Sequence, residues 1–248
     1  MKYIKRSAEE VIKKQERMFK AILVTGARQV GKTTMLKTLK SEINYITLDD
    51  MLLSQAAQED PGLFLKPYKT PIIIDEIQYV PDLLRYIKIE IDNSDKKAMF
   101  YLTGSQQFHL MKNVSESLAG RIGIVNLLGL SLREIKEVNF NEEFLPTDEY
   151  MQKRQQCETN ISYDEIWEII HKGQMPALYQ DDIDIDMFYS TYVNTYIERD
   201  VRNLTQVGDV FSFLKFMTAL ASRIGQLLNL NSVASEVGIS LPLSLIHI

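Results

Sequence analysis

The chain has 248 residues, of which 45% are hydrophobic and 25% are charged. This is the composition of a globular protein with its own core, and it excludes an intrinsically disordered chain. The net charge of −5 gives no global basic field that would draw the chain onto nucleic acid, so any such contact has to be local.

Cysteine, histidine and the N-terminal segment exclude further classes of protein. The single Cys157 cannot form an intrachain disulfide, and the three histidines lack the spacing of metal ligands. Residues 1–20 contain no continuous apolar core and no cleavage site, so they are not a signal peptide. No run approaches the roughly 20 apolar residues that span a bilayer. We therefore expect a cytoplasmic protein without a membrane partner.

The N-terminal third predicts a helix, a strand and a second helix in close succession. Ser7 and Glu10 have the spacing of a capping box, and apolar residues follow at helical intervals, which predicts a helix over 8–19. Residues 21–25 (AILVT) predict a buried strand that ends at a glycine. Residues 32–40 then have helical composition.

Four more runs resemble buried strands, and they cover residues 43–48, 71–75, 99–103 and 124–128. Helical segments separate these runs, and Leu83, Leu84, Ile87 and Ile91 fall on one face of one such segment. Alternating strands and helices predict a mostly parallel sheet with helices on both faces. We therefore predict an α/β domain over residues 1–130.

The pattern changes after residue 130. Helices are predicted over 131–137, 186–202 and 210–222, whereas residues 139–162 are polar and contain proline. Because no further buried strand is evident, we expect a mainly helical C-terminal region over residues 131–242.

A glycine-rich segment follows the first predicted strand, and it reads Gly26-Ala27-Arg28-Gln29-Val30-Gly31-Lys32-Thr33, with Thr34 next. It matches the P-loop pattern between a strand and a helix. In such a loop the backbone N–H groups and the helix N-terminus face phosphates, the lysine contacts the β- and γ-phosphates, and the threonine hydroxyl ligates Mg²⁺. The alternative is a glycine turn that contains lysine and threonine by chance. The complete match favours a site for ATP and Mg²⁺.

Two carboxylates end the strand predicted over residues 71–75, in the arrangement called Walker B. Asp75 is predicted to hold Mg²⁺ through its water shell, and Glu76 to orient or deprotonate the attacking water. Buried strands often end in acidic residues, so this pattern is weak evidence when it stands alone. Behind a P-loop, the catalytic interpretation is the better one.

Polar and basic residues complete the predicted site. Thr103 or Ser105, where the strand 99–103 ends, is a candidate sensor of the γ-phosphate, and a simple polar turn is the alternative. Arg28 and Arg121 are candidates for neutralising charge on the γ-phosphate. For both arginines, the alternative is a solvated surface position or a structural ion pair.

With these motifs in place, the chain resembles bacterial and archaeal AAA-type ATPases, in which an AAA_14-like P-loop domain precedes a conserved, DUF4143-like domain of unknown function. The matching stretches cover nearly the whole chain, in order: 26–34, 74–78 (IDEIQ), 102–107 (LTGSQQ), 117–121 (SLAGR), 128–131 (LGLS) with Glu134, 173–176 (GQMP), and Tyr192 with 195–200 (TYIERD).

This resemblance implies a five-stranded sheet of AAA type with the strand order 5-1-4-3-2, ATP as the ligand, and homo-oligomers in which one chain supplies an arginine to another. It also makes Arg199 and Arg202 candidate contacts. From the residues alone, 198–200 equally fit a solvated helix face with intrahelical ion pairs.

The C-terminal end has two notable features. Residues 230–240 resemble the first helix and turn of a helix-turn-helix, and the second helix is absent, so we expect an incomplete winged helix and a DNA contact through the C-terminal region. Residues 243–248 (LSLIHI) match the translation of a widely used transposon sequencing adapter. We expect this tail to be non-native, and a short native strand is the alternative.

Three functions compete on these grounds. The leading prediction is a Mg²⁺-dependent ATPase coupled to an effector or to DNA. The alternative is a nucleotide-gated switch that binds ATP with little turnover, and the role of Glu76 discriminates the two. A kinase for a small acceptor also uses a P-loop, but Asp75 and Glu76 suit the activation of water better than the binding of an acceptor.

Overall fold

The computed structural model describes residues 3–105, 114, 117–140, 142–157, 160–180, 182–196 and 210–239. The chain divides into two compact units, Met1–Ile183 and Asp184–Ile248. The first unit contains the sheet and every residue of the predicted catalytic site. The domain boundary near residue 130 stays a prediction.

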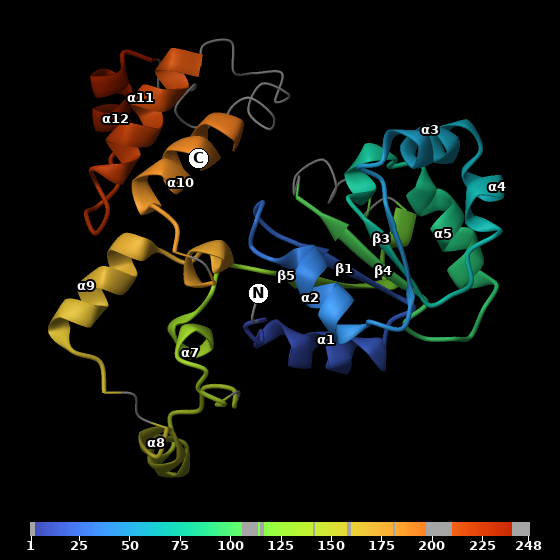
Figure 1. The fold of residues 1–248 in the computed structure, drawn as a ribbon, viewed down its shortest axis with the longest axis horizontal. Coiled ribbons are helices and arrows are strands. Elements are labelled where there is room, and N and C mark those ends of the chain that lie inside the picture. The colour runs from blue at the N-terminus through green and yellow to red at the C-terminus, as the bar shows by residue number, and fades with distance from the viewer. Residues whose placement is uncertain are drawn as a thin grey trace. The chain divides into compact units, whose positions relative to one another are not determined.

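Five strands form one parallel sheet in the first unit (Figure 1), and they are β1 (Ala21–Thr25), β2 (Asn44–Thr47), β3 (Ile72–Asp75), β4 (Phe100–Gly104) and β5 (Ile122–Asn126). Their order in the sheet is β2-β3-β4-β1-β5, and all pairs are parallel. This is the predicted order 5-1-4-3-2, which is therefore confirmed. Strand β5 begins two residues before the predicted strand, because Ile122 pairs with Ala21 at the start of β1.

Helices cover both faces of this sheet, as predicted. Alternate side chains of a strand point to opposite faces, so Ile22 and Val24 pack with α1 (Ala8–Glu16) and α2 (Lys32–Leu39). The opposite face packs against three helices, α3 (Met51–Glu59), α4 (Pro61–Leu65) and α5 (Leu83–Asp92). Each large apolar side chain buried in these layers contributes about 1.5–3 kcal/mol to folding. The apolar strands thus fix the sheet in the centre of the unit.

Helix α1 does not begin with the predicted capping box. The Ser7 side chain makes no capping hydrogen bond, and Glu10 instead pairs with Lys13 at 2.9 Å. The backbone N–H of Ser7 donates to the distant Glu134 carboxylate at 2.7 Å. A capping box is present at the start of α7 (Leu132–Ile135), where Ser131 and Glu134 satisfy each other's backbone N–H groups.

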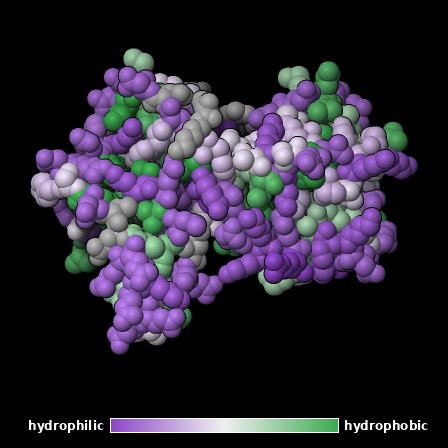
Figure 2. Space-filling model, turned by 60° about the horizontal axis from the view of Figure 1, so that its bottom comes forward, coloured by the Kyte–Doolittle hydropathy of each residue, from purple (hydrophilic) through white to green (hydrophobic). Residues whose placement is uncertain are grey.

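The rest of the first unit contains α8 (Asp148–Gln155), α9 (Tyr163–Lys172) and the short helix η2 (Pro176–Tyr179). Helix α9 falls in the region that we expected to be mainly helical, although no bounds were predicted for it, and α8 falls within residues 139–162, for which no helix was predicted. Four large side chains on α9 are exposed, at 73, 44, 54 and 61%: Tyr163, Ile166, Trp167 and Ile170. Their spacing places them on one helix face. Figure 2 shows hydrophobic side chains as separate patches between hydrophilic ones on the face that it draws.

The second unit contains the helices α10 (Ile185–Tyr196), α11 (Val210–Ala221) and α12 (Leu230–Val237). Its small core joins α11 to α12 through Phe216, Val233 and their neighbours. Gly238, with φ 77°, ends α12, as the predicted turn requires. The tail 243–248 lies outside the described residues, as does the predicted extension of α10 to residue 202. No helix in the described part of the chain is long and apolar enough to cross a membrane.

Candidate functional site

The loop between β1 and α2 has a backbone that few residues other than glycine can adopt. Gly26 has φ 146°, and a Cβ atom there would lie 2.1 Å from the carbonyl oxygen of Leu127. Gln29 and Gly31 also have positive φ values, of 61° and 91°. Loops of this kind expose successive N–H groups around an anion, and the N-terminus of the next helix adds its positive end. The predicted P-loop therefore has the conformation that its sequence requires.

Lys32 begins α2 and lies almost fully buried beneath this loop. Its Nζ donates hydrogen bonds to the carbonyl oxygens of Gly26, at 3.0 Å, and Ala27, at 2.7 Å. The ammonium group thus lies against the loop in which it is predicted to contact the phosphates.

Asp75 ends β3 at the same edge of the sheet and is 5% exposed. Its Oδ1 accepts hydrogen bonds from the hydroxyls of Thr33, at 2.7 Å, and Thr103, at 2.5 Å. Its Oδ2 accepts a hydrogen bond from the Tyr45 hydroxyl at 2.9 Å. The structure therefore brings the two predicted metal ligands, Thr33 and Asp75, into direct contact.

The oxygen atoms of Thr33 and Asp75 fit a magnesium ion. Mg²⁺ is usually held in proteins by one or two carboxylates, waters and the phosphates of the substrate, rather than by a complete cage of side chains. No group of three or more His, Cys, Asp or Glu side chains suited to a metal occurs among the residues that the structure describes. The donor set at the loop thus matches an ion that arrives with a phosphate ligand.

Tyr45 is a member of this site that the sequence did not reveal. Burial, followed by the charge of Asp75 and the hydrogen bond to it, raises the pKa of the Tyr45 hydroxyl to about 12. The Nζ of Lys37 lies 3.4 Å from the centroid of the Tyr45 ring. No motif marks Tyr45, because it lies on β2, outside both the P-loop and the Walker B segment.

Glu76 lies just beyond β3 and has a left-handed backbone, with φ 56° and ψ 49°. Its backbone N–H donates to the Thr103 hydroxyl at 2.9 Å. Its carboxylate accepts hydrogen bonds from the Gln78 amide and, at 3.4 Å, from the Ser105 hydroxyl. The predicted base and the predicted sensor thus lie together, and Gln78 joins them. Gln106 and Gln107 lie outside the described residues.

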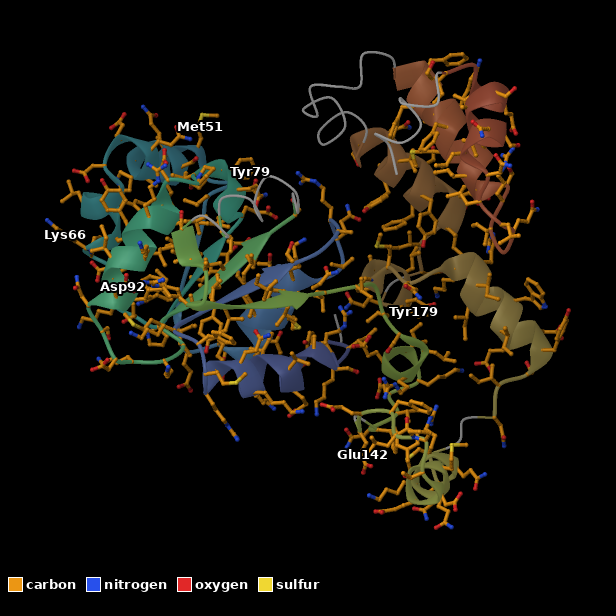
Figure 3. All side chains as sticks on the ribbon, turned by 180° about the vertical axis from the view of Figure 1, so that it is seen from behind. Met51, Lys66, Tyr79, Asp92, Glu142 and Tyr179 are labelled. Atoms are coloured by element: carbon orange, nitrogen blue, oxygen red, sulfur yellow. The ribbon has the colours of Figure 1, made fainter. Side chains whose placement is uncertain are left out.

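The candidate arginines lie in different places. Arg28 is in the loop itself. Arg121 precedes β5 at the opposite edge of the sheet, where its Nε donates to Asp92 at 2.6 Å. This hydrogen bond holds the pKa of Asp92 below its usual value, and Asp92 is labelled in Figure 3 at the C-terminal end of α5. The structure does not bring Arg121 to the loop of its own chain. Arg199 and Arg202 lie outside the described residues.

Arg6 contacts the backbone of the loop, and its side chain is only 4% exposed. Its Nη1 donates to the carbonyl oxygen of Val30 at 2.7 Å, and its Nη2 donates to that of Leu128 at 2.7 Å. Its Nε contacts the carboxylate of Glu134 at 3.2 Å. No sequence motif marked Arg6, whereas Glu134 was singled out by the family resemblance alone.

A cavity of about 320 Å³ adjoins the loop, and its lining includes Tyr3, Gln29, Thr34, Thr38 and Pro176. Its residues come from the N-terminal segment, the loop, α2 and η2. Tyr179, which is labelled in Figure 3, lies at the end of η2, and its hydroxyl donates a hydrogen bond to the carbonyl oxygen of Gly173. The volume lies within the range of small-molecule pockets in proteins.

Comparisons with known proteins agree with this geometry. Residues 18–136 match the family described as AAA domain, and residues 163–243 match a domain of unknown function, DUF8612. The DUF4143-like domain that we expected is not confirmed. Uncharacterized proteins of Mycobacterium tuberculosis and Mycobacterium bovis are each 27% identical to the chain over 222 residues. The match covers 88% of this chain but 44% of each relative, so the chain spans less than half their length.

Among solved structures, the Walker-type ATPase of Pyrococcus abyssi resembles the chain with a TM-score of 0.51 and 14% identity. The likeness covers 95% of this chain and 89% of that one. At this identity it supports the fold alone. The match of residues 18–136 to the family described as AAA domain agrees with the strand order of the sheet and with the conformation of the loop.

Proposed function

We propose that this chain binds ATP with Mg²⁺ and hydrolyses it to ADP and phosphate. The observation that carries the proposal is the meeting of Lys32, Thr33, Asp75 and Glu76 at one edge of the sheet, beside a loop shaped for an anion. Ligands of open parallel sheets bind at the carboxyl ends of the strands, which is where these side chains lie.

The side chains of the loop would bind and orient the triphosphate. Lys32 now donates to two loop carbonyls, and phosphate oxygens within its reach would accept the same protons. Thr33 and Asp75 would hold Mg²⁺. When bound, Mg²⁺ neutralises charge on the phosphate oxygens and fixes their orientation. The cavity beside Gln29 and Thr34 offers space for the nucleoside.

Glu76 is the residue that we assign to water. A carboxylate near the γ-phosphate can accept a proton from the attacking water or hold that water in line. In this structure its carboxylate is already engaged by Gln78 and Ser105. Both contacts are made to Oε2, so Oε1 can still accept a hydrogen bond from water, and we assign Ser105 to sense the γ-phosphate. The same contacts support the alternative, a switch that binds ATP with little turnover.

The test is steady-state ATP hydrolysis with Mg²⁺, with nucleotide binding measured in parallel. Glu76→Gln is expected to lower turnover at least about a hundredfold while keeping ATP binding, since loss of a general base costs about that much. Lys32→Ala is expected to lose both turnover and tight binding. Glu90→Gln and Lys66→Ala change exposed side chains of the same types and are the matched controls.

The outcomes separate the two functions. Turnover by Glu76→Gln equal to that of the parent would remove Glu76 from the mechanism. ATP binding by the parent without turnover would favour the switch. A parent that binds no nucleotide would contradict both.

We also propose that nucleotide state is coupled to an effector through the region 163–243, with DNA as the candidate ligand. The supporting observation is α12 with its glycine turn at Gly238, which has the form of the first half of a helix-turn-helix. The measurement is binding of the full chain to duplex DNA at increasing salt. DNA contact predicts an affinity that falls steeply with salt, because phosphate contacts release counterions. Binding that is absent, or that salt does not change, would contradict it.

A further inference from the structure

Tyr45 lies where two strands and one helix meet. In the sheet, Tyr45 of β2 pairs with Ile73, and Thr47 pairs with Asp75, so Tyr45 and Asp75 lie two residues apart along the same face. From that diagonal position the phenol reaches Asp75 Oδ2 at 2.9 Å. The contact therefore depends on the register of β2 against β3.

Helix α2 holds both ends of this contact. Thr33 and Lys37 are four residues apart and therefore lie on one face of the helix. Thr33 donates to Asp75 Oδ1 at 2.7 Å, and the Lys37 ammonium lies 3.4 Å from the Tyr45 ring centroid. A cation over a ring face is attracted to it, which favours this position of the ring. The helix that begins in the P-loop thus orients the tyrosine as well as the aspartate.

The hydrogen bonds of Asp75 divide unequally between its two oxygens. A carboxylate has about four acceptor positions, two on each oxygen. Oδ1 accepts hydrogen bonds from Thr33 and Thr103, which fills both of its positions. Oδ2 accepts one from Tyr45, which leaves one position among the described residues. The Tyr45 hydroxyl therefore occupies one acceptor position of Oδ2 and determines which position of this carboxylate stays open.

We infer that Tyr45 is a positioning residue for magnesium, because its hydroxyl fixes the one open acceptor position of Asp75. This inference rests on the proposed binding of Mg²⁺ with ATP. Partners that orient a metal-binding carboxylate commonly change metal affinity by tenfold or more when they are removed. Tyr45→Phe keeps the ring and removes only the hydroxyl.

The experiment titrates Mg²⁺ into the full chain with a fluorescent ATP analogue and follows binding rather than turnover. Tyr45→Phe is expected to raise the Mg²⁺ concentration at half-maximal effect about tenfold. Binding of the analogue without Mg²⁺ is expected to stay at the parent's value, and the thermal unfolding midpoint is expected to fall no further than in Tyr101→Phe, which also loses a hydrogen bond to a carboxylate. Tyr101→Phe is the matched control, because its hydroxyl donates to Glu16 and not to Asp75.

Lys37→Met is a second variant, which leaves the hydroxyl in place and removes the cation over the ring. It is expected to raise the Mg²⁺ requirement less than Tyr45→Phe does. An unchanged requirement in Tyr45→Phe, or an equal rise in Tyr101→Phe, would overturn the role of Tyr45 and leave the proposed function intact. A larger rise in Lys37→Met than in Tyr45→Phe would also overturn it. If the parent binds the analogue without any effect of Mg²⁺, the magnesium proposal fails and this inference fails with it.

Discussion

Gly26 lies where the chain leaves β1, and its backbone passes directly beside Leu127. Its φ of 146° and the 2.1 Å approach of a hypothetical Cβ to the Leu127 carbonyl oxygen make two separate demands on this position. The first is conformational and the second is steric. A second glycine with positive φ, Gly120, allows the two demands to be measured separately.

Gly26→Ala is expected to destabilise the fold by more than about 3 kcal/mol and to abolish nucleotide binding, since backbone strain alone costs about 1–3 kcal/mol. Gly120→Ala is the control, because Gly120 has φ 73° but nothing within 4 Å of an added Cβ. Unfolding by urea measures both variants. Equal losses in the two variants would show that the contact with Leu127 contributes nothing.

Thr103 is a second residue that contributes through its hydrogen bonds to neighbouring residues. It is fully buried, donates to Asp75 and accepts from the backbone N–H of Glu76. Thr25 ends the adjacent strand, and its buried hydroxyl has no hydrogen-bond partner among the described residues. These two threonines therefore differ in hydrogen bonding far more than in burial.

Thr103→Val is expected to cost about 1–3 kcal/mol and to lower turnover, because it leaves the part-buried N–H of Glu76 without its acceptor and removes a donor from the buried Asp75 carboxylate. Thr25→Val removes an unpartnered hydroxyl and is expected to be neutral or stabilising. Urea unfolding and ATP turnover of both variants check this contrast. A Thr25→Val variant less stable than Thr103→Val would contradict it.

At the scale of elements, Arg6 and Glu134 connect segments that are far apart in the sequence. Glu134 accepts hydrogen bonds from the backbone N–H groups of Ser7 and Ser131, and Arg6 donates to the P-loop at Val30. Burial alone raises the pKa of the Glu134 carboxyl, but these donors and the charge of Arg6 outweigh it, so the pKa is lowered from 4.5. The start of α1, the loop and α7 are therefore held by one ion pair.

A lowered carboxyl pKa gives stability that is present above pH 4.5 and is lost as the pH falls through the folded value. Glu134→Gln is expected to cost about 3 kcal/mol at neutral pH, since it leaves Arg6 buried without its partner. The gap between parent and variant is expected to stay constant down to about pH 5 and to narrow below the unfolded pKa. Urea unfolding across this range measures it. A gap that widens with acid would show that the carboxylate is not stabilised by folding.

The elements also show what the sequence can predict. The glycine-rich loop 26–33 and the strand that ends at Asp75 were predictable because their residues are neighbours in the chain, and the predicted strand order came from the resemblance. The bounds of α8 and α9 were not predicted because these helices bury no side chain, so no apolar core position marks them. The capping box at Ser7 was wrong because Glu134, distant in sequence, takes the Ser7 N–H. Tyr45 and Arg6 were missed for the same reason, since their partners come from other elements.

At the scale of the whole molecule, the position of Arg121 bears on whether two chains act together at one site. Strands β1 and β5 pair in register, so Arg121 lies at least four residue steps of about 3.3 Å from the level of the P-loop. Its Nε is bound to Asp92. If Arg121 neutralises charge on the γ-phosphate, it does so in the site of another chain, as the resemblance implies.

A mixing experiment tests this arrangement. Arg121→Ala is expected to lower turnover at least about a hundredfold, as loss of an arginine supplied in trans does in other P-loop enzymes. Adding Lys32→Ala, which has no working loop but keeps Arg121, is expected to restore part of that turnover. ATP hydrolysis at several ratios of the two variants is the measurement. Full activity of Arg121→Ala alone, or no recovery on mixing, would exclude the role in trans.

The exposed face of α9 has an optical consequence. Trp167 is the only tryptophan of the 248 residues, it is 54% exposed, and its ring lies edge-on to that of Tyr163 at 6.0 Å. The intrinsic fluorescence of the protein therefore reports on this one face, with red-shifted emission that acrylamide quenches while water covers it. Any partner or second chain that packs on α9 will shift the emission to the blue and reduce the quenching, so the protein carries its own label for the occupation of this surface.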